Sequence, residues 1–378
     1  MDIETFEWGS WRDGKGYKYY LPKQINQPWE WNHAGLNTLL EEASIKLGEL
    51  NSFAKLVPNI DLFIQLHVTT EAVVSSRIEG TQTNIGEALL PEEDVAPERR
   101  HDWKEVQNYT KALNTAIASL QDLPISSRLI HQTHEILISD VRGKHKLTGQ
   151  YRTSQNWIGG ATIEDAIFIP PDHPHVHDLM GDLETFIHNS DLKVPDLVRI
   201  GMVHYQFETI HPFLDGNGRI GRLLITLYLV SRGIMNKPLL YLSKFFERHK
   251  GTYYDNLMRV REQNDMIHWL RHFLVGVRDT AIESADTLSA VLQLKNDLDA
   301  QIREQWGRRT RSALNLLEHL FTNPVVQIKD VQKVCSLSAR AAGNLVHSFD
   351  DAGILKEITG QSRNMRYVFK PYLDKFKE

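Results

Sequence analysis

Hydrophobic residues recur at helical spacing along most of this chain. Between residues 33 and 57 the apolar side chains lie three or four positions apart, and Pro58 ends the run. A second run, from about residue 61 to 79, ends at Gly80, a typical helix terminator. The same spacing predicts helices near residues 102–120, 126–138, 175–189, 195–209, 217–232, 244–262 and 265–307, the last interrupted near Gly276. The pattern therefore predicts a mainly α-helical protein.

Three regions depart from this pattern. Residues 1–30 are rich in aromatic side chains and contain two prolines, which predicts an extended arm packed on the body. Residues 155–171 pair two β-prone runs around a polar turn and predict a β-hairpin. From residue 308 the pattern reads helix, short strand, helix, helix and two strands, an order typical of a winged helix. This last segment also carries more Lys and Arg than Asp and Glu.

Length and composition narrow the class of protein. A chain of 378 residues suits two or three domains, and a net charge of -5 disfavours a globally basic nucleic-acid binder while leaving a local basic patch open. The single cysteine, Cys335, allows no intramolecular disulfide, which suits a reducing compartment. We find no pattern typical of a signal peptide and no long apolar run, so we expect a cytoplasmic protein without a membrane span.

The stretch HPFLDGNGRIGR, residues 211–222, interrupts apolar helical sequence with polar and flexible residues. Gly216 and Gly218 lie just before a predicted helix, where free backbone N–H groups and the helix dipole favour an anion such as phosphate. Arg219 and Arg222 are three positions apart and share one helix face, from which guanidinium groups can contact phosphates.

Two further residues of this stretch suggest chemistry rather than binding alone. Asp215 lies beside the turn and could hold Mg²⁺, the usual companion of a nucleotide polyphosphate. His211 can accept a proton near neutral pH. Such a base beside a phosphate site suggests transfer of a phosphate-containing group to a hydroxyl. The alternative is an ordinary helical connection with surface arginines, which the convergence of these residue types disfavours.

The stretch resembles the signature of the Fic family, His-Pro-Phe-x-Asp/Glu-Gly-Asn-Gly-Arg-x-x-Arg, at every defined position. The similarity extends over roughly residues 30–275, and HYQFETI (204–210) resembles the helix that precedes the signature. Members of the family typically transfer AMP from ATP to a Ser, Thr or Tyr hydroxyl of a protein. The resemblance implies that His211 deprotonates this hydroxyl and that Asp215 holds Mg²⁺. It implies that the residues binding the phosphates are Gly216, Asn217, Gly218, Arg219 and Arg222.

A second motif, SSRIEG at residues 75–80, places Ser75 and Glu79 four positions apart on one helix face. Alone it suggests an ordinary helix end, but beside the Fic signature it resembles the family's inhibitory pattern, Ser/Thr-x-x-x-Glu-Gly/Asn, in which Gly80 takes the last position. The resemblance implies that Glu79 pairs with Arg222 and withholds this arginine from the γ-phosphate of ATP. In some relatives the corresponding Glu also supports removal of AMP, so a reverse activity stays open.

The hairpin resembles the flap of the same family. An exposed edge there could pair with an extended segment of the target protein and present its hydroxyl to His211. The candidates for lining the nucleotide or target groove are Ile158, Gly159 and Gly160. A purely structural hairpin is the alternative.

Aromatic and histidine clusters give weaker indications. By resemblance Tyr253 and Tyr254 contact the nucleotide, although such a pair also suits a protein core. Arg261 stands where some relatives carry Asn, which leaves the contacts to the base open. The stretch DHPHVHD, residues 172–178, has three His at alternate positions, but it suits the polar start of a helix better than a metal site.

The C-terminal segment raises a separate question. A winged helix can place a helix in the major groove of DNA. Candidate groove residues are Ser338, Arg340 and Asn344, with Arg363 and Arg366 on the wing. Winged helices also act as protein-interaction arms, and the sequence leaves both readings open, as it does the formation of a homodimer.

The predicted fold is mainly α, with a Fic helical core, a β-hairpin flap and a C-terminal winged helix. The predicted domains are an N-terminal arm and inhibitory helix (1–100), a Fic core (101–276), a helical linker (277–307) and the winged helix (308–378). The predicted function is protein adenylyltransferase, with ATP as substrate and Mg²⁺ as cofactor. The target is a protein, and the chain itself is one candidate target. The alternatives are a Fic enzyme with another nucleotide-linked donor and a nucleotide-sensing DNA-binding regulator.

Overall fold

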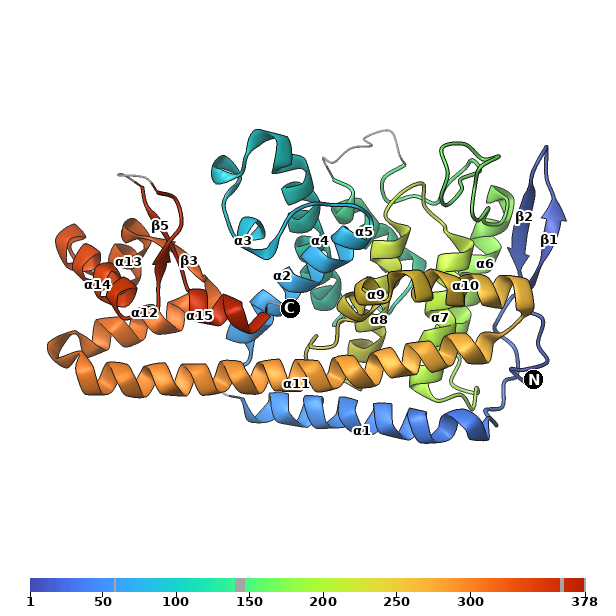
Figure 1. Cartoon of the computed structure of the whole chain (residues 1–378). Coiled ribbons are helices and arrows are strands. Elements are labelled where there is room, and N and C mark those ends of the chain that lie inside the picture. Colours follow the sequence, from blue (N-terminus) through green and yellow to red (C-terminus); the bar gives the residue numbers. More distant parts are fainter. Residues whose placement is uncertain (58, 140–146, 361–363, 377–378) are drawn as a thin grey trace.

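The computed structural model describes residues 1–57, 59–139, 147–360 and 364–376, which form a mainly helical molecule, as predicted. Two long helices, α1 (Ala34–Leu56) and α11 (Met266–Gln305), lie side by side along one edge (Figure 1). The remaining helices of the core are α2 (Asp61–Ile78), α3 (Ile85–Ala88), α4 (Arg100–Ser119), α5 (Ser127–Leu137), α6 (Val176–His188), α7 (Asp196–Ile210), α8 (Asn217–Ser231), α9 (Ser243–Arg248) and α10 (Lys250–Gln263).

Helices α7 and α8 are the most deeply buried elements of the core. Every residue of α7 from Leu197 to Ile210 is buried, and α8 is buried over most of its length. A helix that is shielded on all sides packs against neighbours around its whole circumference and has little freedom to move. The loop that joins α7 to α8 therefore has a rigid support at both ends.

Helix α11 runs without interruption for 40 residues, which corrects the predicted break near Gly276. A Cβ atom at Gly276 would lie 2.8 Å from the ring of Phe245 on α9. The glycine is needed for this close approach, and the helix continues through it. Among the described residues, none of the helices combines the length and the apolar composition that crossing a membrane requires.

The predicted helix over residues 244–262 is two helices, α9 and α10. The backbone of His249, between them, leaves the helical region (φ -111°, ψ 34°). The sequence does mark this break, because the polar stretch ERHKGT at residues 247–252 interrupts the apolar spacing and contains Gly251.

The N-terminal arm packs on the body as expected, but it contains a hairpin that the sequence did not indicate. Strands β1 (Gly9–Asp13) and β2 (Lys18–Pro22) pair antiparallel, with Trp11 opposite Tyr20. The turn is closed by a hydrogen bond from the Gly14 N–H to the Tyr17 carbonyl (2.8 Å). Trp8 and Tyr20 are buried, so the hairpin adds aromatic side chains to the core.

The flap is a reversed loop that is less regular than the predicted hairpin. Its two runs meet in one antiparallel bridge between Ile158 and Phe168, and neither run forms a named strand. Gly159 and Gly160 both adopt positive φ (74°), and a Cβ atom at Gly160 would lie 2.4 Å from the Asp165 carbonyl oxygen. The chain turns so sharply here that the pairing cannot extend.

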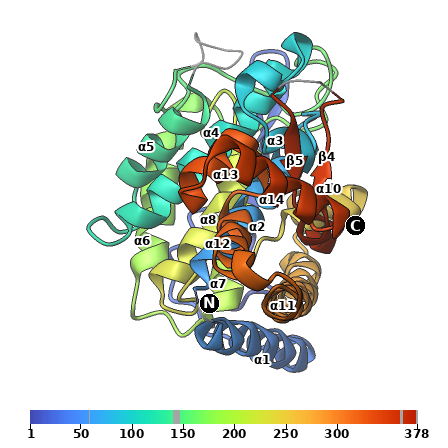
Figure 2. The same ribbon diagram turned by 90° about the vertical axis from the view of Figure 1, so that its left-hand side faces the viewer.

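The C-terminal segment has the predicted order of elements. These are α12 (Thr310–Thr322), β3 (Val325–Gln327), α13 (Ile328–Cys335), α14 (Ala339–Asp351), β4 (Lys356–Glu357) and β5 (Arg366–Val368), followed by α15 (Lys370–Leu373) and the 3₁₀ turn η5 (Asp374–Phe376). The sheet order is β3-β5-β4. Figure 2, turned by 90°, shows this segment in front of the core, where α12 packs on α2.

The residues predicted to contact DNA differ from one another in their exposure and contacts. Ser338, Arg340 and Asn344 are exposed on or beside α14. Arg363 lies outside the described residues. Arg366 forms an ion pair with Asp94 of the 3₁₀ turn η1 (Glu92–Asp94) and is therefore engaged within the chain. Binding of DNA stays a prediction.

Candidate active site

The loop between α7 and α8 holds the predicted chemistry. It begins at His211, whose backbone is left-handed (φ 49°, ψ 61°), and ends at Gly216, which is also left-handed (φ 78°). The side-chain oxygen of Asn217 accepts a hydrogen bond from the Phe213 N–H, and its NH₂ group donates to the Phe213 carbonyl, both at 2.8 Å. Asn217 therefore fixes the shape of this loop, and its amide is directed at the backbone rather than at a phosphate.

His134 on α5 also supports this loop, through contacts with Phe213 and Asp215. Its ring stacks on Phe213 with a centroid distance of 3.8 Å and an interplanar angle of 7°. Its Nδ1 accepts a hydrogen bond from the Gly149 N–H (2.9 Å), so Nε2 carries the hydrogen and donates to the Asp215 carbonyl (3.0 Å). No sequence pattern pointed to His134, because the contact forms only when α5 packs against the loop.

The start of α8 is where the sequence predicted an anion, and the carboxylate of Glu79 lies there. A Cβ atom at Gly218 would be only 2.3 Å from Oε1 of Glu79. Gly218 therefore leaves room for this carboxylate. Because Glu79 is the residue that follows α2, the end of α2 is brought directly against the first turn of α8.

Arg222 holds Glu79 in place. Its Nη2 donates to Oε1 of Glu79 (2.7 Å) and to the Ser75 carbonyl (2.9 Å), while its Nε donates to Oγ of Ser75 (2.9 Å). Arg222 is buried, whereas about a third of the Glu79 side chain is exposed (37%). Burial alone would raise the pKa of Glu79, but the charge and hydrogen bond of Arg222 hold it below its usual value. Gly80 has φ 105° and lets the chain turn away at this point.

Arg219 lies next to this pair but has other partners. Its Nη1 donates to Glu105 of α4 (3.2 Å), and its Nη2 donates to Oδ1 of Asp215 (3.4 Å). The same Oδ1 accepts the N–H of Gly216 (2.6 Å). Asp215 and Arg219 are thus brought together at the loop, and Glu105 is a member of the site that the sequence did not reveal.

His211 faces the site with an unprotonated imidazole. Burial, and after it the positive charge of Arg152, lower the pKa of His211 to about 3, although Glu79 acts in the opposite direction. Its Nδ1 has no hydrogen-bond partner among the described residues. An imidazole in this state can accept a proton at physiological pH.

The two tyrosines have different environments. Tyr253 is buried, and its hydroxyl pairs with Nε2 of His204 (2.9 Å), so it belongs to the core. Tyr254 is partly exposed. Burial, and after it the charge of Glu79, raise its pKa to about 12, and the charges of Arg222 and Glu79 act on both tyrosines. The guanidinium of Arg261 lies 3.7 Å from the ring centroid of Phe168.

The flap candidates lie on an exposed turn. Gly159 and Gly160 are exposed and Ile158 is half-buried. Asn156, which precedes them, donates to the Phe213 carbonyl (2.8 Å) and so attaches the flap to the loop that carries His211. The flap is therefore adjacent to the predicted base, although its edge is one bridge long.

Glu208 is a further buried acid that the sequence analysis did not single out. Burial raises its pKa to about 7, although the charge of Arg222 opposes this shift. A Cβ atom at Gly221 would lie 2.2 Å from Oε1 of Glu208, so this glycine makes room for the carboxyl group. Glu208 thus adds a group that can change charge near neutral pH close to Arg222.

No group of three or more His, Cys, Asp or Glu side chains among the described residues is arranged to hold a metal ion. The histidines of residues 172–178 instead form the 3₁₀ turn η3 (His173–His175) and the start of α6, as the sequence favoured. Asp215 is a single carboxylate at the loop. That suits Mg²⁺, which in nucleotide sites typically binds one or two carboxylates together with substrate phosphates.

Comparisons with known proteins show which families and proteins this chain is similar to. Residues 37–118 match the Fic/DOC family N-terminal region, and residues 124–229 match the Fic/DOC family. Protein adenylyltransferase Fic of Aedes aegypti is 28% identical over 157 residues, which cover 39% of this chain and 29% of that protein. The protein of the same name from Culex quinquefasciatus is 27% identical over 208 residues, covering 52% of this chain and 37% of that protein. The chain thus spans well under half the length of these curated relatives.

Solved structures show the same fold. A Fic family protein from Desulfovibrio desulfuricans has a TM-score of 0.56 and 22% identity, and the match covers 91% of this chain and 98% of that one. A Fic domain containing signaling protein from Bacteroides thetaiotaomicron has a TM-score of 0.52 and 17% identity, covering 65% and 95%. The similarity to the first protein includes nearly the whole chain.

Proposed function

We propose that this chain transfers AMP from Mg-ATP to a hydroxyl group of a protein and that Glu79 restrains this reaction. The family supports the proposal, since residues 37–118 and 124–229 match the Fic/DOC family. The observation that carries the proposal is the convergence of His211, Gly218 and Arg222 at one loop. The neutral base, His211, lies beside the predicted anion site, and the carboxylate of Glu79 fills that site.

ATP would bind through its phosphates at the start of α8. The backbone N–H groups of the first turn and the positive end of the helix dipole favour the phosphate charge. Arg219 and Arg222 would contact the distal phosphates, which suits guanidinium geometry. Asp215 would hold Mg²⁺, which neutralises part of the phosphate charge when it is bound.

The transfer itself requires one proton acceptor and one nucleophile. The hydroxyl oxygen of a Ser, Thr or Tyr side chain would attack the α-phosphorus while the imidazole of His211 accepts the hydroxyl proton. The bond from the α-phosphorus to the oxygen that bridges to the β-phosphorus breaks, and pyrophosphate leaves. The short edge of the flap, attached to the loop by Asn156, is the segment against which we expect the target to lie.

The restraint follows from competition for one guanidinium. Arg222 cannot donate the same N–H groups to Glu79 and to a terminal phosphate. With Glu79 in place, the triphosphate cannot adopt the arrangement that aligns the α-phosphorus with the attacking oxygen. Correct alignment of this kind accounts for a large part of catalytic rate.

Labelled nucleotides test the proposed reaction. We expect the Glu79→Gly protein, incubated with Mg²⁺ and a candidate target or alone, to incorporate label from the α-phosphate of ATP and none from the γ-phosphate. Parallel reactions with α-labelled GTP, CTP and UTP test the alternative donors. Incorporation from the γ-phosphate would show phosphorylation, and preferred incorporation from another nucleotide would identify a different donor.

A further inference from the structure

Arg152, which lies between α5 and the flap, is buried beside the predicted base. Its guanidinium donates only to backbone carbonyl oxygens among the described residues, and these belong to Ser154, Pro171, Ile210 and His211. The distance from its Nε to the His211 carbonyl oxygen is 2.9 Å. Its own N–H donates to the Pro212 carbonyl (2.9 Å). One side chain therefore connects both ends of the flap to the point where α7 ends.

The charge of Arg152 also acts on His211. Burial lowers the pKa of Arg152 to about 10, which leaves it charged at neutral pH. The other groups that face the imidazole are Arg261 of α10, which disfavours its protonated form, and Glu79 and the backbone of Glu208, which favour it. Arg152 is the largest of the charge effects on His211.

We propose that Arg152 is a positioning residue for His211: it holds the left-handed backbone of His211 and the flap in one arrangement, with its own positive charge beside the imidazole. This inference rests on the proposed role of His211 as the base. A left-handed backbone is strained for a residue other than glycine, and such strain persists only where surrounding contacts hold it. The hydrogen bonds to the carbonyl oxygens of Ile210 and His211 provide these contacts.

Titration of the His211 imidazole by NMR tests the proposal without requiring activity. The His211→Ala protein assigns the signal. We expect Arg152→Met to raise the pKa of His211 by about one unit, because a nearby positive charge is lost, and Arg152→Lys to raise it less. In the Glu79→Gly background, both variants should lower kcat by more than they raise KM for ATP. An unchanged His211 titration in both variants, or an unchanged kcat in a folded Arg152→Lys protein, would overturn the proposal.

A second, independent observation concerns the face of α2 that leads to Glu79. His67, Glu71, Ser75 and Glu79 are spaced four positions apart and form one stripe along the helix. Glu71 accepts hydrogen bonds from the Tyr109 hydroxyl (2.8 Å) and from Ser243 Oγ (2.5 Å). Ser75 and Glu79 are held by Arg222. From His67 to Glu79 the stripe is about 18 Å long, at 1.5 Å per residue.

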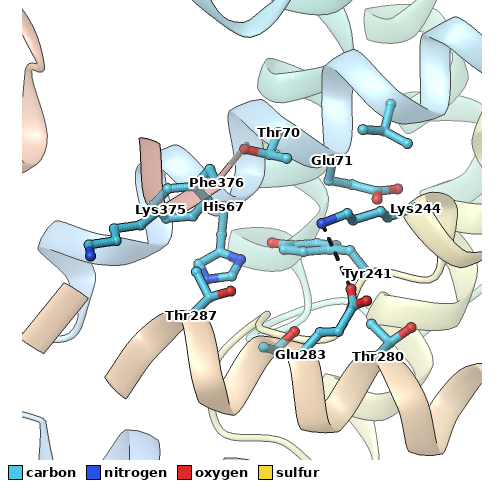
Figure 3. Close-up of a pocket in the computed structure, with 12 residues that line it drawn as sticks. His67, Thr70, Glu71, Tyr241, Lys244, Thr280, Glu283, Thr287, Lys375 and Phe376 are labelled. Carbon is cyan, nitrogen blue, oxygen red and sulfur yellow. Dashed lines mark ion pairs between the residues drawn. The ribbon is translucent and has the colours of Figure 1, made fainter. Parts of the chain in front are cut away.

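The far end of this stripe contacts the C-terminal segment. The ring of Phe376, in η5, meets His67 edge-on with a centroid distance of 4.9 Å. Figure 3 shows Phe376 and His67 at one side of a pocket that also includes Glu71, Tyr241, Lys244 and Glu283. Its volume of about 70 Å³ has room for several water molecules and is too small for a nucleotide. A second contact of the same kind joins Phe63 of α2 to Phe321 of α12 (5.5 Å).

We infer that the C-terminal segment stabilises α2 in the position that presents Glu79 to Arg222. A helix is stiff along its axis, so a contact at His67 affects where Glu79 lies. The pocket beside Phe376 means that this contact is not completely packed. This inference rests on the proposed competition between Glu79 and ATP.

The affinity for Mg-ATP, measured by calorimetry, tests the coupling. We expect Phe376→Ala and His67→Ala each to tighten ATP binding by about 2- to 10-fold in the otherwise unchanged protein and to have no effect in the Glu79→Gly background. Ile358 is an exposed apolar residue elsewhere in the C-terminal segment, and Ile358→Ala is the control. It should leave the affinity for ATP the same in both backgrounds. The inference would be overturned if the two substitutions left the affinity for ATP the same in the protein that keeps Glu79. It would also be overturned if they changed the affinity equally with Glu79 and with Gly at this position. Absence of AMP transfer in every variant would instead overturn the proposed function.

Discussion

Replacing Glu79 with glycine is expected to raise the initial rate of AMP transfer by about 10- to 100-fold, the range of a coupling between two groups that compete for one site. The substitution removes the carboxylate that accepts the Nη2 of Arg222 at 2.7 Å and vacates the space beside Gly218. Arg222 then becomes available to the distal phosphates. Incorporation of label from the α-phosphate of ATP measures the rate.

A matched control lies at the same end of α2. Arg77, two positions before Glu79, forms an ion pair with Glu247 of α9 at 3.3 Å. The Glu247→Gln protein should transfer AMP at the rate of the unchanged protein, since this substitution leaves Glu79 and Arg222 in place. Equal rates for the Glu79→Gly protein and the unchanged protein would show that Glu79 does not restrain the reaction.

Replacing His211 with alanine is expected to lower AMP transfer by about 100- to 10,000-fold, the usual contribution of a general base. The experiment belongs in the Glu79→Gly background, where the starting rate is high. ATP binding should change little, because in the proposed binding mode the phosphates contact the start of α8 and not the imidazole. His347→Ala, which removes an exposed histidine from α14, is the control. Transfer that survives loss of His211 at full rate would exclude it as the proton acceptor.

The chemistry around residues 211–222 could be predicted because its residues are adjacent in the sequence. A helix start, two glycines and two arginines that lie close together in the sequence predict an anion site without any tertiary contact. The pairing of Arg222 with Glu79, which are 143 positions apart, could be expected only from the resemblance of SSRIEG to an inhibitory motif. Arg152, His134 and Glu105 gave no signal, because each reaches the site through packing of a separate element.

The fold shows the same division between local and tertiary effects. Apolar spacing predicted most helices, since one buried face is a property of the segment itself. It failed at Gly276, where the glycine is needed for contact with Phe245 rather than for a break. It also missed the hairpin of β1 and β2, because short strands that bury Trp8 and Tyr20 against the core have no distinct local pattern.

The central claim is that this chain transfers AMP from ATP to a protein hydroxyl, with neutral His211 as the proton acceptor, once Glu79 no longer holds Arg222. Intact mass spectrometry of the purified Glu79→Gly protein after incubation with Mg-ATP tests it most directly, with a candidate target added where one is available. We expect a mass gain equal to one or more AMP groups, which is small in the unchanged protein and absent when His211→Ala is added. A gain equal to phosphate, or a gain of AMP that persists without His211, would contradict the account.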